Sequence, residues 1–290
     1  MASDFQLNTQ ATEQILASVD ISAKEFSTIA QIVYQVSGIK LTAGKEGLVK
    51  TRLSKRLRVL SLPNFQEYIR HIENDPKGAE KRLMIDLLTT NKTDFFREMP
   101  HFDFLKKTAI PYWKSNQKKI RIWSAGCSSG EEPFSYGMWF WEEFGELASW
   151  DLKILATDLS VRVLTKARQS LYEWEQVADV PAPIINKYFL KNTSTTPPLY
   201  QVHDKVRNLV SFAQLNLMET WPMKGPFDLI SCRNVMIYFD KPTQERLIQR
   251  YSGLLVPGGF LFVGHSESLS SIHHDLDYMQ PATFRKPQAR

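Results

Sequence analysis

The stretch IRIWSAGCSSGEEP, residues 120–133, decides the fold of this chain. An apolar run opens into a turn of small residues, and two adjacent carboxylates close the turn. This order predicts a buried strand, a tight loop and the start of a helix. Gly126 and Gly130 permit backbone conformations and close approaches that a Cβ atom would block. Such a loop suits a nucleotide-like ligand.

Two kinds of ligand compete for this loop. A phosphate cradle would hold an anion with backbone amides at the helix N-terminus. Glu131 and Glu132 would repel a phosphate there, but carboxylates accept hydrogen bonds from ribose hydroxyls or from an amine. The pair therefore favours an uncharged ribose or a cationic ligand.

The composition narrows the class of protein. The chain has 290 residues, of which 43% are hydrophobic and 23% charged, and this is typical of a globular protein with two domains. No apolar run approaches the roughly 18 residues of a membrane span, so we expect no membrane insertion. The N-terminus lacks the basic start and apolar run of a secretory signal, which predicts a cytoplasmic protein.

The cysteines and histidines predict neither a disulfide nor a metal site. Cys127 and Cys232 are the only cysteines, and their spacing matches no disulfide framework and no metal motif. We expect both to be buried thiols. The six histidines form no HExxH or HxH pattern.

The N-terminal part is predicted to be a polar tail, residues 1–20, followed by a helical domain, residues 21–90. Ser22 and Glu25 form a capping-box pattern ahead of an apolar run. A second helix is expected at residues 45–60, where apolar side chains recur at three- and four-residue spacing. Further helices are expected at residues 64–74 and 80–89.

The second of these helices has a basic face. At 100° per residue, Lys55 and Arg58 point almost opposite the apolar stripe, and Arg52 and Arg56 flank them. A charged helix face is usually only solvated, so the pattern alone identifies no partner.

Residues 91–99 join the two halves of the chain. Flexible spacers are rich in glycine and serine, whereas this segment contains Phe95 and Phe96. We therefore expect a linker packed against the second domain, residues 100–290, in which Pro100 begins a helix.

From Lys119 onward, strand and helix patterns alternate, which predicts an α/β fold with a parallel, doubly wound sheet. The alternation breaks at residues 171–207, which contain four prolines and predict an inserted subdomain. Residues 278–286 are expected to form a closing antiparallel strand. The other expected strands are residues 120–124, 152–157, 209–213, 227–232 and 260–264, and the expected helices are residues 133–144, 161–169 and 243–255.

Ligands of such sheets bind at the carboxyl ends of the strands. Asp158 follows the second strand, where an acid can hold ribose hydroxyls, but the first turn lacks the GxGxxG fingerprint and so disfavours NAD. Asn216 and Leu217 follow the third strand and suit an adenine edge and face, although an Asn that caps a turn explains them equally well. Three polar side chains follow the fourth strand: Arg233, Asn234 and Tyr238.

Five motifs carry a family resemblance: NKTDFFRE at 91–98, WSAGCSSGEEP at 123–133, ATD at 156–158, CRNVMIYFD at 232–240 and GHSE at 264–267. Together they resemble the chemotaxis receptor methyltransferases of the CheR family. The resemblance implies a Rossmann-like, seven-stranded domain that depends on S-adenosyl-L-methionine, an all-helical N-terminal domain and a small inserted β-subdomain. It also implies methylation of receptor glutamates, with S-adenosyl-L-homocysteine as the product.

The resemblance further implies roles for individual residues. Arg97 and Tyr238 match positions beside the reacting centre, where they would orient the substrate carboxylate. Glutamate, with a pKa of ~4.3, is already ionised at neutral pH, so methyl transfer to it needs no general base. The cofactor contacts carried over by position are Asn91, Thr93, Arg97, Glu132, Asp158, Asn216, Leu217, Arg233 and Asn234.

The implied partner is the cytoplasmic helical bundle of methyl-accepting chemotaxis receptors. Its methylation region is acidic, which assigns the basic helix to substrate binding through Arg52, Lys55, Arg56 and Arg58. Some family members also bind a receptor C-terminal pentapeptide through a glycine-containing loop of the inserted subdomain. The matching loop here, residues 191–201, contains no glycine, which leaves a pentapeptide tether in question.

Two other functions compete with this one. A nucleic-acid methyltransferase would suit the pI near 9.0. The Pro-Pro-aromatic turn common in amino-group methylation of bases is absent after the fourth strand, so we expect no nucleic-acid partner. A non-catalytic module could instead sense S-adenosylmethionine or dock to receptors, but the retention of every matched pocket position argues against it.

Overall fold

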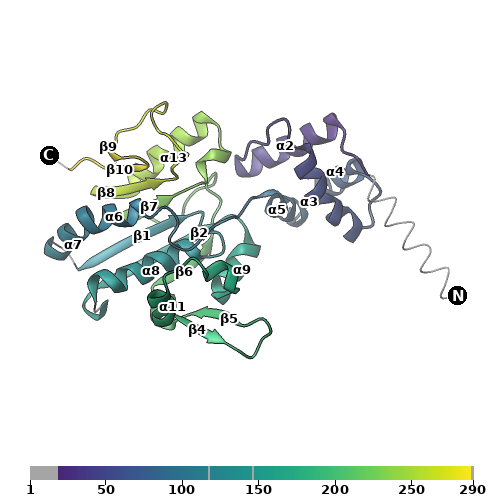
Figure 1. Cartoon of the computed structure of the whole chain (residues 1–290). Helices are drawn as coiled ribbons and strands as arrows, with labels where there is room; N and C mark the ends of the chain where they lie inside the picture. The colour runs from purple at the N-terminus through teal and green to yellow at the C-terminus, as the bar shows by residue number, and fades with distance from the viewer. Residues whose placement is uncertain (1–18, 117, 146, 289–290) are drawn as a thin grey trace. The chain divides into compact units, whose positions relative to one another are not determined.

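The computed structural model describes residues 19–116, 118–145 and 147–288. The expected polar tail therefore lies almost entirely outside the described residues. The chain divides into two compact units, Met1–Thr90 and Asn91–Arg290, which Figure 1 shows in purple to blue and in blue to yellow.

The first unit is helical over its described residues. The hydroxyl of Ser22 accepts a hydrogen bond from the Glu25 N–H at 3.3 Å, and the Ser22 N–H donates to the Glu25 carboxylate at 2.8 Å. This reciprocal pair is the predicted capping box, and it begins the first described helix. The helices are α2 (Ala23–Ser37), α3 (Glu46–Val59), α4 (Phe65–Glu73) and α5 (Ala79–Leu88).

The basic face of α3 is divided between internal contacts and solvent. Arg56 pairs with Glu80 of α5, with Nη2–Oε2 and Nε–Oε1 distances of 2.5 and 2.8 Å. Arg52 donates to the carbonyl oxygens of Leu88 and Thr89 at 2.7 and 2.9 Å. Arg52 and Arg56 therefore help to hold α3 to the end of α5. The other two basic side chains, Lys55 and Arg58, are exposed.

The second unit is built on a seven-stranded sheet with the order β6-β2-β1-β7-β8-β10-β9. The first five of these strands pair in parallel, and β10 pairs antiparallel with both β8 and β9. The α/β, seven-stranded architecture predicted from the sequence is thus confirmed. The strands are β1 (Lys119–Ala125), β2 (Asp151–Asp158), β6 (Val210–Gln214), β7 (Phe227–Cys232), β8 (Leu255–Val263), β9 (Asp277–Gln280) and β10 (Thr283–Arg285).

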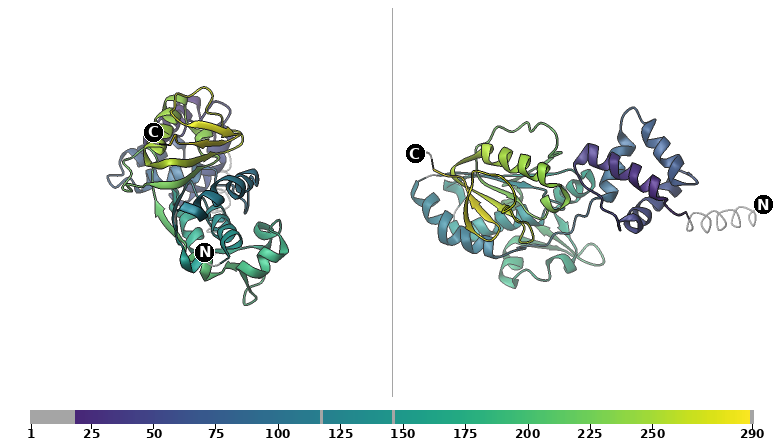
Figure 2. Two further views of the ribbon diagram at one scale, coloured as in Figure 1. Left: turned by 90° about the vertical axis from the view of Figure 1, so that its left-hand side faces the viewer. Right: turned by 90° about the horizontal axis from the view of Figure 1, so that it is seen from above.

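Alternation along β1 explains how helices cover both faces of the sheet. Ile120 and Ile122 belong to a core with Tyr136 of α8. Trp123 faces the other way, with its ring centroid 5.3 Å from that of Tyr251 in α13. Figures 1 and 2 show α8 and α13 on opposite sides of the sheet. Right-handed crossovers in opposite directions from the β1–β7 switch point produce this arrangement.

The helices of the second unit begin before the sheet. Pro100 starts the first of them, as the sequence predicts, and a π-helical turn interrupts the run toward Trp113. None of the described helices of either unit has the length and apolarity needed to cross a membrane. The elements are α6 (Pro100–Phe104), η1 (Leu105–Ala109), α7 (Ile110–Asn116), α8 (Glu131–Phe144), η2 (Leu147–Ser149), α9 (Val161–Gln169), η3 (Met236–Tyr238) and α13 (Lys241–Leu254).

The C-terminal run differs from the sequence prediction. Residues 278–286 were expected to form one closing strand, but β9 and β10 form an antiparallel hairpin. Pro281 offers no N–H for a sheet ladder, and Ala282 adopts a left-handed φ of 60°. The chain therefore turns between these two residues, and the hairpin supplies two of the seven strands.

A second, three-stranded sheet with the order β3-β5-β4 occupies the predicted insertion. Figure 1 shows β4, β5 and α11 below the main sheet. The core under this sheet includes Phe95, whose ring lies 4.9 Å from Tyr172 and 5.3 Å from Phe189 between centroids. The inserted elements are β3 (Leu171–Tyr172), α10 (Trp174–Val177), α11 (Ala182–Tyr188), β4 (Phe189–Asn192), β5 (Leu199–Val202) and α12 (Asp204–Arg207).

Glu80 is the buried acceptor that joins α3, α4 and α5. Its carboxylate accepts from Arg56 and, at 2.9 Å, from the Tyr68 hydroxyl. Burial alone would raise the pKa of Glu80, but the hydrogen bonds from Arg56 and Tyr68 outweigh it and lower the pKa. The ionised form therefore stabilises the first unit above the unfolded pKa, and this contribution is lost as the pH falls through the folded pKa.

We expect Glu80→Gln to destabilise the first unit by about 2–4 kcal/mol, because it leaves Arg56 without its charged partner. Native-state hydrogen exchange of the α3 and α5 amides measures the change. Glu67→Gln is the matched control, since the Glu67–Arg70 pair is exposed and its loss is expected to cost less than about 0.5 kcal/mol. Equal effects of the two substitutions would contradict the role given to Glu80.

Candidate functional site

The loop after β1 is held tightly against the end of β2. The N–H groups of Gly126 and Cys127 both donate to the Thr157 carbonyl, at 2.8 and 2.9 Å. Gly126 has a φ of 99°, and a Cβ atom there would lie 2.4 Å from Cγ2 of Val235. Glycine is therefore required at this position on both conformational and steric grounds.

Asp158 connects this loop to the linker. Its carboxylate accepts from the Ser128 N–H and from the Ser160 N–H, each at 2.9 Å. The Ser128 hydroxyl in turn donates to the Asn91 carbonyl at 2.7 Å. Two residues expected to contact the cofactor, Asn91 and Asp158, are thus brought to one edge of the sheet. Ionised carboxylate oxygens have further lone pairs, so Asp158 can still accept from ribose hydroxyls.

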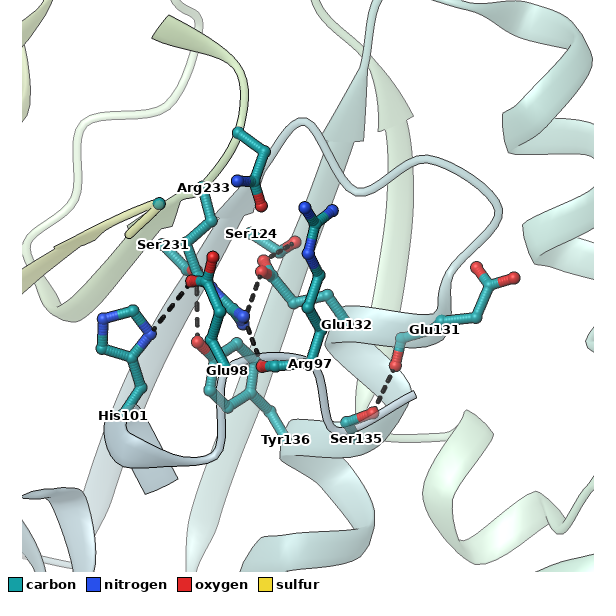
Figure 3. Close-up of polar contacts among 12 residues, drawn as sticks. Arg97, Glu98, His101, Ser124, Glu131, Glu132, Ser135, Tyr136, Ser231 and Arg233 are labelled. Atoms are coloured by element: carbon teal, nitrogen blue, oxygen red, sulfur yellow. Dashed lines mark hydrogen bonds and ion pairs between the residues drawn. The ribbon is translucent and has the colours of Figure 1, made fainter. Parts of the chain in front are cut away.

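A buried guanidinium lies between two carboxylates at the same edge (Figure 3). Arg233 Nε lies 2.9 Å from Glu98 Oε2, and Arg233 Nη1 lies 3.1 Å from Glu132 Oε2. Arg233 Nη2 also donates to the Arg97 carbonyl oxygen. All three nitrogens therefore have partners inside the protein, and only 3% of the Arg233 side chain is exposed.

This cluster gives Arg233 a structural role, while the direct cofactor contact implied by the family resemblance remains a proposal. Burial alone would lower the pKa of Arg233, but Glu132 and Glu98 outweigh it and raise the pKa. For Glu98, burial is likewise outweighed, and Arg233 lowers the pKa of that carboxyl. The guanidinium therefore positions Glu132 and the linker.

Glu132 and Glu131 face different surroundings although they are adjacent. Glu132 accepts from the Ser124 hydroxyl at 2.7 Å and lies beside Arg233, and burial raises its pKa. Figure 3 shows the Glu131 side chain pointing away from this cluster. The cofactor contact that the resemblance implies for Glu132 remains a proposal.

Arg97 lies on the linker above the cluster. Its Nη1 is 3.4 Å from the Lys92 carbonyl oxygen, and the side chain is half-buried. Thr93, expected to be a cofactor contact, is half-buried on the same segment. Phe96 fixes the segment because its N–H donates to the Ser135 hydroxyl of α8 at 2.8 Å.

The loop after β7 is organised by a residue to which the sequence analysis gave no role. Glu267 accepts from the N–H groups of Asn234, Ile237 and Gly264 at 2.9, 3.0 and 2.5 Å. Asn234 has a φ of 58° and approaches Gly264 so closely that a Cβ on the glycine would lie 2.5 Å from Asn234 Nδ2. Tyr238, the second residue predicted beside the reacting centre, is half-buried in η3 of this loop.

Asn216 caps a turn in the structure. Its side-chain oxygen accepts from the Met218 N–H at 3.0 Å, and its amide nitrogen lies 3.2 Å from a Glu219 oxygen. Leu217 follows it, and its carbonyl accepts from Arg250 at 2.7 Å. The structure thus shows the capping alternative for Asn216, while adenine binding by this pair remains a proposal.

Several residues of the site adopt left-handed backbone conformations without being glycine. Phe96, Glu98, Ser128 and Asn234 have φ values of 52°, 60°, 48° and 58°. Each such residue costs free energy and persists only where its surroundings fix it. Their concentration in the linker and in two sheet-edge loops indicates a pre-organised site.

Glu98, Glu267 and His101 are the residues that sequence reasoning missed. Glu98 and Glu267 do occur in the NKTDFFRE and GHSE motifs, so their motif membership was the available signal. His101 is fully buried, with Nε2 3.2 Å from the Ala282 carbonyl. Burial lowers the pKa of His101 to about 3, so the ring is neutral at pH 7.

Glu131 connects the loop after β1 to the inserted subdomain. Its carboxylate accepts from the Ser129 hydroxyl at 2.8 Å and from Gln176 Nε2 at 3.1 Å. The Tyr172 hydroxyl donates to the Ser129 carbonyl at 2.8 Å. Burial raises the pKa of Glu131 to about 7, although the Ser129 hydroxyl opposes the shift.

This raised pKa predicts a pH dependence of stability. A carboxyl whose folded pKa lies above its unfolded value stabilises the fold fully below the unfolded pKa, and that contribution is lost as the pH rises toward 7 and beyond. The unfolding free energy of the second unit should therefore fall between pH 5 and pH 8, with a Glu131 share on the order of 1–3 kcal/mol.

Glu131→Gln should flatten this fall, because a neutral amide replaces the titrating group. Urea unfolding at each pH measures the slope for wild type, for Glu131→Gln and for the exposed control Glu175→Gln. A Glu131→Gln slope identical to that of wild type would show that Glu131 does not titrate in this range.

Comparisons with known proteins identify the family of this chain. Residues 91–284 match the family model described as CheR methyltransferase, SAM binding domain, and residues 24–89 match the CheR methyltransferase, all-alpha domain. A chemotaxis protein methyltransferase of Klebsiella aerogenes is 41% identical over 91% of this chain and 90% of its own length. Chemotaxis protein methyltransferase 2 of Pseudomonas aeruginosa is 42% identical over 87% and 89%.

A third relative, from Borreliella burgdorferi, is 39% identical over 93% of this chain and 96% of its own length. Among solved structures, PKMT2 from Rickettsia typhi in complex with AdoHcy aligns with a TM-score of 0.31 at 18% identity, over 50% of this chain and 20% of that chain. One family model matches the helical part of this chain, and the other matches the part that contains the sheet. The chain therefore belongs to the CheR family of chemotaxis protein methyltransferases, with an S-adenosylmethionine-binding domain that contains the seven-stranded sheet.

Proposed function

We propose that this methyltransferase transfers the methyl group of S-adenosyl-L-methionine to glutamate side chains of chemotaxis receptors and forms glutamate methyl esters. The observation that carries the proposal is that the carboxylates of Glu132 and Asp158 lie at the carboxyl edge of the sheet, where Arg233 also holds the backbone of the linker residue Arg97. Such an edge can hold a cationic nucleoside and receive an anionic acceptor.

The residues at this edge fit the methyl donor. Asp158 offers carboxylate oxygens to ribose hydroxyls, and Glu132 offers negative charge to a sulfonium or ammonium group. Gly126 has no Cβ atom, which would otherwise clash with Val235 at this loop. Asn91, Thr93, Asn216, Leu217 and Asn234 would complete the contacts from the linker and the neighbouring loops.

Two buried groups near the site are poorly placed to act as a general base. Burial raises the pKa of Cys127 well above its usual value, and His101 has no exposed surface. Neither residue is placed to remove a proton from an acceptor amine or hydroxyl. A glutamate acceptor loses no proton, so this arrangement suits it better than a nucleobase amine.

When bound, S-adenosyl-L-methionine supplies a methyl group that a carboxylate oxygen takes, while the electron pair of the broken C–S bond stays on sulfur. The protein then has to bring the two reactants together in line. Arg97 would orient the acceptor carboxylate from the linker, and Tyr238 would do so from the loop after β7. Arg233 positions both sides of the site through its bonds to Glu132 and to the Arg97 carbonyl.

Methyl-labelled S-adenosyl-L-methionine and cytoplasmic receptor fragments test the proposed reaction. We expect label on receptor glutamates in a form that alkali releases as methanol. Asp158→Ala should reduce cofactor affinity by on the order of 1–3 kcal/mol, because hydrogen bonds to an ionised acceptor are lost. Base-stable label, or label on DNA or RNA in place of receptor, would contradict the proposal.

Two exposed basic residues are the proposed receptor contact. Lys55 and Arg58 remain available on α3, whereas Arg52 and Arg56 are engaged with α5 and its C-terminal end. An acidic receptor bundle would therefore meet the charge of the exposed pair first. This narrows the substrate-binding role that the sequence resemblance gave to all four residues.

We expect the double variant Lys55→Ala/Arg58→Ala to raise the KM for receptor fragments by about 2- to 30-fold at low salt. The effect should shrink as salt screens exposed charges, and affinity for S-adenosyl-L-homocysteine should not change. Lys24→Ala/Lys77→Ala removes the same charge from other exposed positions of the first unit and serves as the control. An equal rise in KM for both pairs would show a general charge effect without a docking face.

A further inference from the structure

Three potential metal ligands meet beside the methyl-transfer site although they form no sequence motif. Glu98, His101 and His265 each offer one ligand atom, and these atoms all lie within 4.8 Å of one another. Glu98 and His101 come from the linker and the first turn of α6, and His265 comes from the turn after β8. The chain separation hides this group from a search for HExxH or HxH patterns.

The neighbours of the His101 ring fix its orientation. The ring stacks on Phe262 at 4.4 Å between centroids with an interplanar angle of 12°. Nε2 lies 3.2 Å from the Ala282 carbonyl, which can only accept, so Nε2 must carry the proton. Nδ1 is then a bare acceptor, and it has no hydrogen-bond partner among the described residues.

The bare nitrogen faces another acceptor. Nδ1 lies 3.6 Å from Glu98 Oε2, and Figure 3 shows the ring turned toward this carboxylate. A separation of 3.6 Å is too long for a direct hydrogen bond. Two lone pairs thus face each other in a buried position, an arrangement that a cation between them would stabilise.

The Nδ1–Oε2 separation matches the distance between two ligand atoms of a tetrahedral metal site. Zinc binds imidazole nitrogen and carboxylate oxygen at about 2.0–2.2 Å, so tetrahedral ligand atoms lie roughly 3.4 Å apart. The Nδ1–Oε2 distance of 3.6 Å is close to this value before any adjustment. The His101 and Glu98 atoms therefore already span one edge of a coordination tetrahedron.

His265 completes the group from the solvent side. The backbone N–H of His265 donates to Glu98 Oε1 at 3.2 Å, which holds the turn against the carboxylate. Its ring lies 5.3 Å from the His101 ring between centroids, and the residue is exposed. An exposed ring on a turn can rotate by the small amount that binding requires, and it leaves a path for the ion and a fourth position for water.

The charges nearby permit a cation. Arg233 donates through Nε to the same Glu98 oxygen, but a carboxylate oxygen has two lone pairs and can serve both partners. Glu132 lies on the other side of Arg233, so two carboxylates surround one guanidinium. Two imidazoles and one carboxylate form the borderline N/O set that Zn²⁺, Co²⁺ and Ni²⁺ prefer over Mg²⁺ or Ca²⁺.

We propose that Glu98, His101 and His265 form a binding site for one divalent transition-metal ion, with zinc as the best match. Because Glu98 also holds Arg233, the ion would bind directly against the cluster that positions Glu132 and the linker. This inference does not depend on which acceptor the enzyme methylates.

Titration of the full chain, free of any affinity tag, with Co²⁺ and then Zn²⁺ tests the site. We expect one ion per chain, bound more tightly than about 10 μM, with visible Co²⁺ absorption that Zn²⁺ abolishes. His265→Ala should weaken binding at least about tenfold, because one of three ligands is lost. His273→Ala, at an exposed histidine eight residues along the chain, should leave binding unchanged.

A second variant tests the buried ligand, His101. His101→Phe keeps an aromatic ring against Phe262 but removes both nitrogens, and it should abolish binding. Retained binding of S-adenosyl-L-homocysteine reports that each variant is folded. No stoichiometric binding by the wild type, or equal affinity in wild type and His265→Ala, would overturn the proposal.

Discussion

The buried contact between Arg233 and its two carboxylates is the constraint on which the functional site depends. Arg233 reaches Glu98 on the linker, Glu132 at the start of α8 and the Arg97 carbonyl, and it leaves only 3% of its side chain exposed. A buried ion pair is a poor source of net stability because both charges lose water. Its value here is positional, since this one side chain joins the linker, the start of α8 and the loop after β7.

The surrounding hydrogen bonds extend this constraint across the sheet edge. Ser128 joins the linker to Asp158, and Glu267 joins the loop after β7 to the loop after β8. The left-handed residues lie at these junctions, so part of the folding free energy is used to hold an unfavourable backbone. A methyl transfer that needs no general base gains mainly from such fixed placement.

Local patterns predicted the fold and part of the site. The capping box at Ser22, the stripe on α3 and the strand–loop–helix order at residues 120–133 depend on neighbours in sequence, and the structure has each of them. The β9–β10 hairpin differs from the single strand expected at residues 278–286, because the chain turns at Pro281 and Ala282. The roles of Glu98 and Arg233 could not be read locally, because the two residues lie 135 positions apart. Arg52 and Arg56 looked exposed for the same reason, since their partners lie on or just beyond another helix.

Hydrogen–deuterium exchange of the linker in wild type and in Arg233→Met tests the central claim most directly. If Arg233 holds the linker over the sheet edge, the amides of residues 91–99 should exchange faster in the variant, including the Phe96 N–H that Ser135 accepts. Amides of the central strands β1 and β7 should keep their wild-type protection. Unchanged exchange in residues 91–99 of a folded Arg233→Met variant would contradict the account.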